Sequence, residues 1–251
     1  MRKVKLLLPF LLLWCLVASA RAEDDFGLWG GIEIKKKITK SLDFNVEGEF
    51  RSRDNVRTVD RWSGMAGLSY DVCSWLKTSV DYTFLYSYEP LEYTKAGNIV
   101  PEYWLKRHRF NVAFTGKWDW KRVSFSLRER WQYTYRPQHA TEKYDGGDGS
   151  PKDDEIIKGK GKNNLRSRLK VEYDIPKCKF TPYVSCELTH DLHDGFYYEK
   201  TRCMAGTEWK LSKKHGFDFY YLYQVLNEDE DEPNKHVIGA KSLFKFYLIT
   251  S

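Results

Sequence analysis

The chain has 251 residues, with 41 Lys and Arg against 35 Asp and Glu. Four of the basic residues and none of the acidic ones lie in residues 1–22, so the remainder has 37 basic and 35 acidic residues. This near-neutral balance excludes the strongly basic surface that is expected of a nucleic-acid-binding protein. No apolar run after residue 18 is long enough to form a transmembrane helix.

The first residues have the three-part pattern of a secretory signal peptide. Three of the first five residues are basic, and residues 6–18 are almost entirely apolar. Ala20 and Ala22 are small residues at the two positions that a signal peptidase recognises. The pattern predicts cleavage after Ala22, which leaves one domain at residues 23–251.

Polar and apolar residues alternate along most of the remaining chain, which predicts β-strands with one polar and one apolar face. In the clearest strand, Leu42, Phe44, Val46, Gly48 and Phe50 alternate with charged or amide side chains. The same alternation recurs at residues 76–88, 109–118, 165–173, 217–225 and 241–248.

Three features favour an outer-membrane barrel over a soluble β-sandwich. Several strands run to roughly thirteen residues, whereas soluble strands average about five or six and a tilted membrane crossing needs about nine to eleven. Trp and Tyr gather near the strand ends, as in the aromatic girdles of such barrels. The connections alternate in length, as periplasmic turns and external loops do. The short ones are residues 39–41, 72–74, 119–121, 175–177 and 213–215, and the long ones are 54–58, 89–102, 137–163, 191–195 and 227–235.

The predicted fold is an antiparallel transmembrane β-barrel of 10–12 strands after an N-terminal signal peptide. The pattern gives about eleven strands, whereas bacterial single-chain barrels have an even number. Either residues 26–38 are not a full barrel strand, or a further strand lies in a long loop. An aromatic-rich last strand at residues 241–251 is typical of the signal read by the barrel-assembly machinery.

Several segments together resemble a known family, the uncharacterised outer-membrane barrels of Bacteroidetes grouped as domain of unknown function 2490. The resemblance covers nearly all of the chain after residue 22, and it implies an outer-membrane barrel with no established activity. The segments that carry it are residues 25–29 (DFGLW), 47–51 (EGEFR), 59–62 (VDRW), 107–112 (RHRFNV), 127–137 (LRERWQYTYRP) and 165–168 (LRSR).

The charged residues on the polar face of each predicted strand are the candidate site, because they would line the lumen of the barrel. They are Glu47, Glu49, Arg51, Arg61, Asp81, Arg109, Arg128, Arg130, Arg166, Arg168, Arg202 and Glu208. One interpretation is a ladder of cross-strand ion pairs that fills the interior. The other is a narrow lumen or pore that favours anions, because basic residues outnumber acidic ones.

Two further features concern the apolar face. Glu129 falls on it midway along a strand, where a carboxylate is unfavourable, and either a β-bulge that turns it inward or a position above the bilayer would relieve this cost. Cys186 and Cys203 share this face on consecutive strands. If residues 192–197 form the loop, the two cysteines stand opposite one another as a candidate disulfide.

No catalytic motif is found: the chain has no Gly-x-Ser-x-Gly elbow and no phosphate-binding Gly-rich loop, and the histidines have no zinc-binding spacing beyond His190 and His193 in a predicted loop. We therefore expect a non-enzymatic protein of the Gram-negative outer membrane, structural or a small channel with a charged lumen. We expect no cofactor and no metal, and outer-membrane lipid, lipopolysaccharide and the assembly machinery as partners. The alternatives are a lipid-modifying barrel enzyme and a secreted soluble β-sandwich that binds a polymer.

Overall fold

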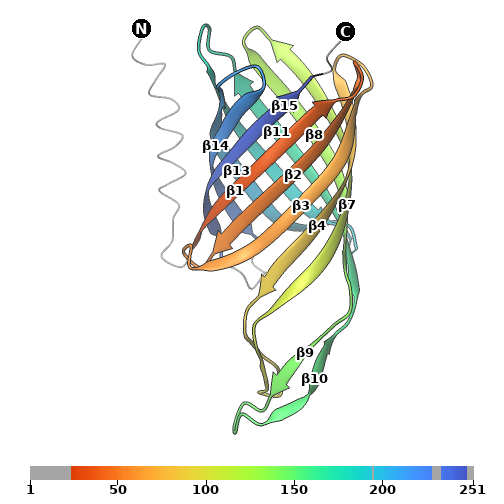
Figure 1. The fold of residues 1–251 in the computed structure, drawn as a ribbon, viewed down its shortest axis with the longest axis vertical. Coiled ribbons are helices and arrows are strands. Elements are labelled where there is room, and N and C mark those ends of the chain that lie inside the picture. Colours follow the sequence, from red (N-terminus) through yellow and green to blue (C-terminus); the bar gives the residue numbers. More distant parts are fainter. Residues whose placement is uncertain (1–23, 194, 228–232, 248–251) are drawn as a thin grey trace.

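A computed structural model describes residues 24–193, 195–227 and 233–247, and the predicted signal peptide lies outside them. Within the described residues, eleven long strands close into a single barrel, and four shorter strands form a separate sheet beyond one end of it (Figure 1). The barrel strands are β1 (Asp25–Lys37), β2 (Leu42–Arg53), β3 (Thr58–Asp71), β4 (Leu76–Glu89), β7 (Tyr103–Trp120), β8 (Val123–Arg136), β11 (Lys160–Tyr173), β12 (Phe180–Asp191), β13 (Tyr197–Lys210), β14 (His215–Leu226) and β15 (Lys235–Phe246). No helix of the described residues is long and apolar enough to cross a membrane.

The closure of the barrel explains the odd strand number. Neighbouring strands pair antiparallel except at the seam, where β1 pairs with β15 in parallel, from Asp25 opposite Lys235 to Lys36 opposite Phe246. A meander of eleven strands must close in this way, because its first and last strands run in the same direction. The predicted range of 10–12 strands is confirmed, but a wholly antiparallel barrel is wrong. Neither explanation offered for the odd count accounts for it, since β1 is a complete barrel strand and the strands in the long loops form a separate sheet.

The connections at the two ends of the barrel differ in length. One end, which we call the short-turn end, carries residues 38–41, 72–75, 121–122, 174–179 and 211–214 between strands. The other end, the long-loop end, carries residues 90–102, 137–159 and 227–234 together with two shorter connections. The predicted alternation is therefore correct except at residues 54–58 and 191–195, where the connections are shorter than the turn of residues 174–179 at the short-turn end.

The connection from β2 to β3 is a tight turn and not the long loop that the sequence predicted. Asp54, Asn55 and Val56 have φ of 54°, 54° and 68°, in the left-handed region that a β-branched residue rarely adopts. Two hydrogen bonds to β1 hold the turn, because the amide of Asn55 donates to Oδ1 of Asp25 at 2.9 Å and that of Val56 donates to the carbonyl of Phe26 at 3.1 Å.

The two longest loops contain regular structure that the sequence reading did not predict. Their strands form one sheet in the order β10-β9-β6-β5, which projects from the long-loop end (Figure 1). Lys152 joins the two loops, since its Nζ donates to Oδ1 of Asn98 at 2.9 Å and lies 2.5 Å from Oδ2 of Asp145. The strands are β5 (Glu92–Tyr93), β6 (Ile99–Val100), β9 (His139–Tyr144) and β10 (Pro151–Ile157).

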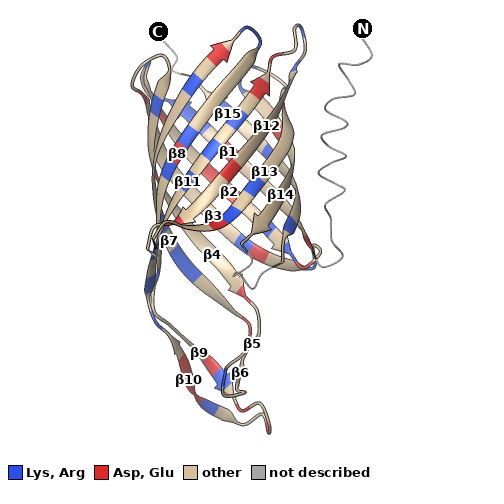
Figure 2. Cartoon of the chain, turned by 180° about the vertical axis from the view of Figure 1, so that it is seen from behind, with Lys and Arg blue, Asp and Glu red and all other residues tan. Residues whose placement is uncertain are grey.

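Polar residues mostly face the lumen and apolar residues mostly face outward, with apolar exceptions inside the barrel such as Leu85 and Leu222. On β7, the outward Phe114 is 55% exposed, whereas the inward Asn111 is only 3% exposed. Charged side chains recur along the strands between uncharged positions, as an alternating pattern requires (Figure 2). The outer wall has no second sheet packed against it within the described residues, so the β-sandwich alternative is wrong.

Aromatic side chains cover glycines inside the lumen. Tyr220 is directly opposite Gly239, and a Cβ at Gly239 would lie 2.0 Å from the tyrosine ring. Tyr183 similarly lies over Gly206, where a Cβ would meet the ring at 2.7 Å. Such cover replaces the packing that a glycine lacks and fixes the register of the strands.

Candidate functional site in the barrel lumen

The middle of the lumen is crossed by an ion-pair network around Glu187 on β12, whose side chain is buried. Arg128 Nη2 donates to Glu187 Oε2 at 2.8 Å, and Arg166 Nε donates to Glu187 Oε1 at 3.2 Å. Arg202 Nη1 lies 4.0 Å from the same oxygen. One carboxylate thus connects strands β8, β11, β12 and β13 across the interior.

A second network, on the opposite part of the wall, is centred on Glu49 of β2. Its Oε1 lies 2.6 Å from Nε of Arg51 and 3.9 Å from Nη2 of Arg61. The guanidinium carbon of Arg51 is 3.5 Å from the ring centroid of Trp29, and that of Arg202 is 5.6 Å from it. Both cations are therefore close enough to the indole ring to be attracted by its face.

Charges in the short-turn half of the lumen are mostly paired. The contacts are Lys241 with Glu47 (2.7 Å), Lys170 with Glu208 (3.0 Å), Lys35 with Asp43 (3.2 Å) and Lys77 with Asp43 (3.4 Å), and Asp81 accepts a hydrogen bond from Asn111 (2.5 Å). This half agrees with the predicted ladder of cross-strand pairs that fills the interior.

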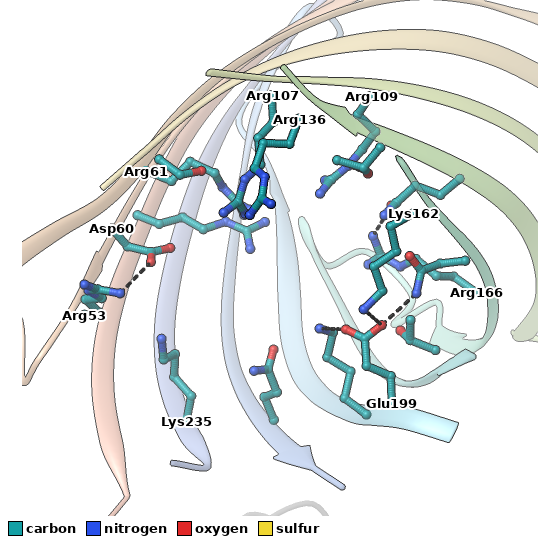
Figure 3. A pocket seen from close by; sticks show the side chains of 18 of the residues that line it. Arg53, Asp60, Arg61, Arg107, Arg109, Arg136, Lys162, Arg166, Glu199 and Lys235 are labelled. Atoms are coloured by element: carbon teal, nitrogen blue, oxygen red, sulfur yellow. Dashed lines mark hydrogen bonds and ion pairs between the residues drawn. The ribbon is translucent and has the colours of Figure 1, made fainter. Parts of the chain in front are cut away.

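The long-loop half of the lumen contains a cavity of about 420 Å³ (Figure 3). All eleven barrel strands contribute to its wall, and basic residues dominate it. The described basic residues that line it are Arg51, Arg53, Arg61, Arg107, Arg109, Arg136, Lys160, Lys162, Arg166, Lys200, Arg202 and Lys235, against Asp60, Glu89 and Glu199. A cavity with this lining attracts anions.

The three acidic residues of the wall are themselves paired, and the basic residues of the wall outnumber them by nine. Glu89 lies 2.5 Å from Nη2 of Arg107, and Glu199 lies 3.0 Å from Nζ of Lys162. Asp60 lies 4.0 Å from Nη1 of Arg53. Figure 3 shows Arg61, Arg107, Arg109 and Arg136 extending from the wall toward the space between the strands.

The structure divides the twelve predicted lumen residues between two regions. Arg51, Arg61, Arg109, Arg166 and Arg202 line the cavity. The remaining seven occupy inward positions outside the cavity lining, and they are Glu47, Glu49, Asp81, Arg128, Arg130, Arg168 and Glu208.

Sequence reasoning missed much of the cavity rim, namely Arg53, Arg107, Arg136, Lys160, Lys162 and Lys235, together with Trp29. These residues could have been found, because the alternation of inward-facing polar residues continues beyond the strand ends that the sequence analysis assigned. Arg107 precedes Arg109 by two positions, and Arg53 follows Arg51 by two.

Glu129 faces outward, and the proposed β-bulge at this position is wrong. The pairing of β8 with β7 and with β11 is continuous through Glu129, opposite Phe114 and Ser167. The hydroxyl of Ser167 donates to Oε2 of Glu129 at 2.6 Å. A hydrogen bond on the outer wall therefore takes the place of the inward turn.

Cys186 and Cys203 are directly opposite each other on β12 and β13. Both side chains are on the outer wall, with their sulfur atoms 3.6 Å apart, and both thiols are free. The loop is one residue shorter than assumed, since Asp191 is opposite Tyr197, and the one-residue register shift between Thr189 and His190 restores the alignment of the two cysteines.

The long loops carry two acidic runs, at residues 145–155 and 228–232. In the part of the chain that the structure describes, no three His, Cys, Asp or Glu residues are grouped to hold a metal ion. The hydrogen bond from Lys152 instead holds the pKa of Asp145 below its ordinary value, assisted by the backbone amide of Gly147. The second acidic run, residues 228–232, lies outside the described residues.

The fold and the lumen define an all-β protein, a closed barrel with a charged interior and an apolar outer wall. The chain belongs to the family described as protein of unknown function DUF2490, whose model matches residues 26–235. This match confirms the family that the sequence motifs indicated.

Two solved structures are similar to this chain. One is the beta domain of the Bordetella autotransporter Brka, with 11% identity and a TM-score of 0.49 over 76% of this chain and 80% of that one. The other is the NanC porin, with 12% identity and a TM-score of 0.45 over 84% of this chain and 94% of that one. A search of curated proteins gives no match.

Proposed function

We propose that the protein spans the outer membrane of a Gram-negative cell and admits small anions to its lumen as a non-enzymatic channel of low conductance. The observation that carries the proposal is the cavity wall, where basic residues outnumber acidic ones four to one. Its lipid partners are outer-membrane lipid and lipopolysaccharide, and the barrel-assembly machinery inserts it.

The outer wall supports a membrane location. Large apolar side chains are exposed along it, including Ile32 at 53% and Leu127 at 52%, and such an apolar band is unfavourable in water. On β4 and the turn before it, Trp75 and Tyr86 mark the two edges of the band. With a rise of about 3.3 Å per residue and a tilt of about 40°, the distance between them along the barrel axis is about 28 Å, close to the hydrocarbon thickness of a bilayer.

The unequal ends support one orientation. Short turns face the periplasm in outer-membrane barrels, and long loops face outward. The cavity opens toward the long-loop end, since its wall includes strand-end residues such as Arg136 and Lys235. In this orientation the anion-attracting cavity faces the medium, and the paired charges of the short-turn half restrict passage to the periplasm.

Ion selectivity in planar bilayers tests the proposal. Purified barrel under a KCl gradient is expected to give a reversal potential of the sign that chloride permeation produces. Truncation of two arginines outside the cavity lining, Arg128→Ala with Arg130→Ala, is expected to raise the current, because it opens the filled part of the lumen. Arg57→Ala, in an exposed turn, is the control. Cation selectivity of the wild type would reject the channel, and so would the absence of current from both the wild type and the double variant.

One observation favours a second candidate, a hydrolase acting on membrane lipid. His215 Nε2 and Ser242 Oγ lie 3.0 Å apart on the outer wall near the short-turn end, as a nucleophile and its base require. Among the described residues, however, no carboxylate hydrogen-bonds to this histidine, whose ring stacks on Phe244 with centroids 4.5 Å apart. Phospholipid hydrolysis by wild type that is lost in Ser242→Ala would replace the channel proposal with the enzyme.

A further inference from the structure

Arg109 is one of two arginines of the cavity wall, the other being Arg136, that form no ion pair among the described residues. It lines the cavity, and its Nε donates to Oγ1 of Thr134 at 3.2 Å. Within the described residues it forms no ion pair, although four other arginines, at positions 51, 61, 166 and 202, are close enough for their charges to repel it. A positive charge held in this way favours a bound anion.

Among the residues that the structure describes, two carboxylates contact this group of five arginines. Glu49 contacts Arg51 at 2.6 Å and Arg61 at 3.9 Å, and Glu187 contacts Arg166 and Arg202. Neither glutamate lines the cavity. Five positive charges therefore meet two negative ones, and the excess faces the cavity.

Hydrogen-bonding capacity in the wall is also unused. The Nε atoms of Arg61 and Arg136 are buried and have no hydrogen-bond partner among the described residues. Guanidinium groups offer forked donors that match the oxygens of phosphate or carboxylate, and a halide ion cannot satisfy such forks. The cavity volume of about 420 Å³ is within the range of small-molecule sites.

We propose that this cavity is a binding site for a small multivalent oxyanion, a solute with at least two phosphate or carboxylate groups, centred on Arg109. The proposal rests on the anion-admitting lumen proposed above and adds the ligand class and the site. The ligand's oxygens take the place of Glu49 and Glu187 as partners of the wall arginines. A divalent ligand fits better than a monovalent one, because the uncompensated charge is spread over several strands.

Calorimetric titration of the folded barrel in detergent with pyrophosphate, at constant chloride, tests the site. Arg109→Gln is expected to weaken binding about tenfold or more, because charged hydrogen bonds are lost. Arg109→Lys, which keeps the charge but not the fork, is expected to give an intermediate affinity. The control is Arg168→Gln, an inward arginine outside the cavity lining, which is expected to change the affinity less than twofold.

Removal of a carboxylate that competes with the ligand is expected to raise the affinity for pyrophosphate. Glu187→Gln releases Arg166 and Arg202, so pyrophosphate is expected to bind several-fold more tightly, and Glu49→Gln provides the same test should Glu187→Gln fail to fold. A heat-shift gel verifies folding of each variant. Equal losses in Arg109→Gln and Arg168→Gln, or no binding of millimolar pyrophosphate to folded wild type, would overturn the site. Anion-selective current without pyrophosphate binding would reject the binding site but not the channel. Pyrophosphate binding without such current would reject the channel but not the binding site.

Discussion

Arg166 donates two hydrogen bonds to one oxygen of Glu187, although the two residues are not opposite each other in the sheet. The directly opposed pairs are Arg166 with Thr189 and Arg168 with Glu187. Arg166 therefore reaches diagonally along the wall, and its Nη1 also donates to Oε1 of Gln132 at 3.0 Å. Glu187 is thereby shared among arginines from three strands, which makes it the central charge of the lumen.

The first prediction concerns the stability that this charge provides. Glu187→Gln leaves three buried arginines without their common partner, and it is expected to lower the free energy of unfolding by about 3 kcal/mol. The measurement is urea unfolding of the barrel in phospholipid vesicles. Glu208→Gln is the matched control, because its partner Lys170 keeps a second acid, Glu172, at 2.8 Å. The control is expected to lose less than about 1 kcal/mol, and equal losses in both variants would show that Glu187 has no central role.

A second prediction concerns Tyr220, which covers Gly239 on β15, the last strand of the barrel. A Cβ at Gly239 would lie 2.0 Å from the ring of Tyr220, so Gly239→Ala must displace the ring and is expected to cost about 1–3 kcal/mol of stability. Gly64→Ala is the control, because nothing lies within 4 Å of the position of its Cβ. The same urea titration measures both variants. The proposed packing is refuted if the two substitutions have the same effect.

The period-two pattern was sufficient to predict the faces of the strands but not the way the barrel closes. Phe44 and Val46 face outward and Glu47 faces inward as predicted, because each strand meets a different environment on each side. The parallel pairing of β1 with β15 follows from the total number of strands, and the sequence of a single strand carries no information about that number. The sheet of β5, β6, β9 and β10 was missed because short polar strands carry little alternation.

Only part of the candidate site was predicted, and the reason is related. Arg51 and Arg109 were found because they lie within clear alternating rows, whereas Arg107 and Arg136 lie where the rows run into the loops. The contact of Arg166 with Glu187 depends on the register of β11 and β12, in which Arg166 is opposite Thr189, and on the diagonal reach of the arginine side chain. Position on a face can be read from the sequence, but partners across the lumen cannot.

A third prediction concerns the two cysteines on the outer wall. Cys186 and Cys203 are opposed with their sulfur atoms 3.6 Å apart, so a mild oxidant is expected to join them within one chain. Mass tagging of the unfolded mature protein should then count two remaining thiols, those of Cys73 and Cys178. The link is expected to stabilise the barrel by about 3 kcal/mol. Cys186→Ala should form no internal link, and a link between Cys73 and Cys178 instead would disprove the assignment.

The last prediction concerns the carboxylate on the outer wall. If hydrocarbon surrounds Glu129, Glu129→Leu is expected to raise the free energy of unfolding in vesicles, by less than the about 2–4 kcal/mol known for a basic residue at the bilayer centre. Ser167→Ala alone is expected to lower it by about 1 kcal/mol, because the 2.6 Å hydrogen bond to Glu129 is lost. Once Glu129 is leucine, the serine has no partner to satisfy and its removal should cost nothing. A double-mutant cycle measures this difference, and a cost of Ser167→Ala that is the same in both backgrounds would mean that water, not lipid, surrounds this part of the wall.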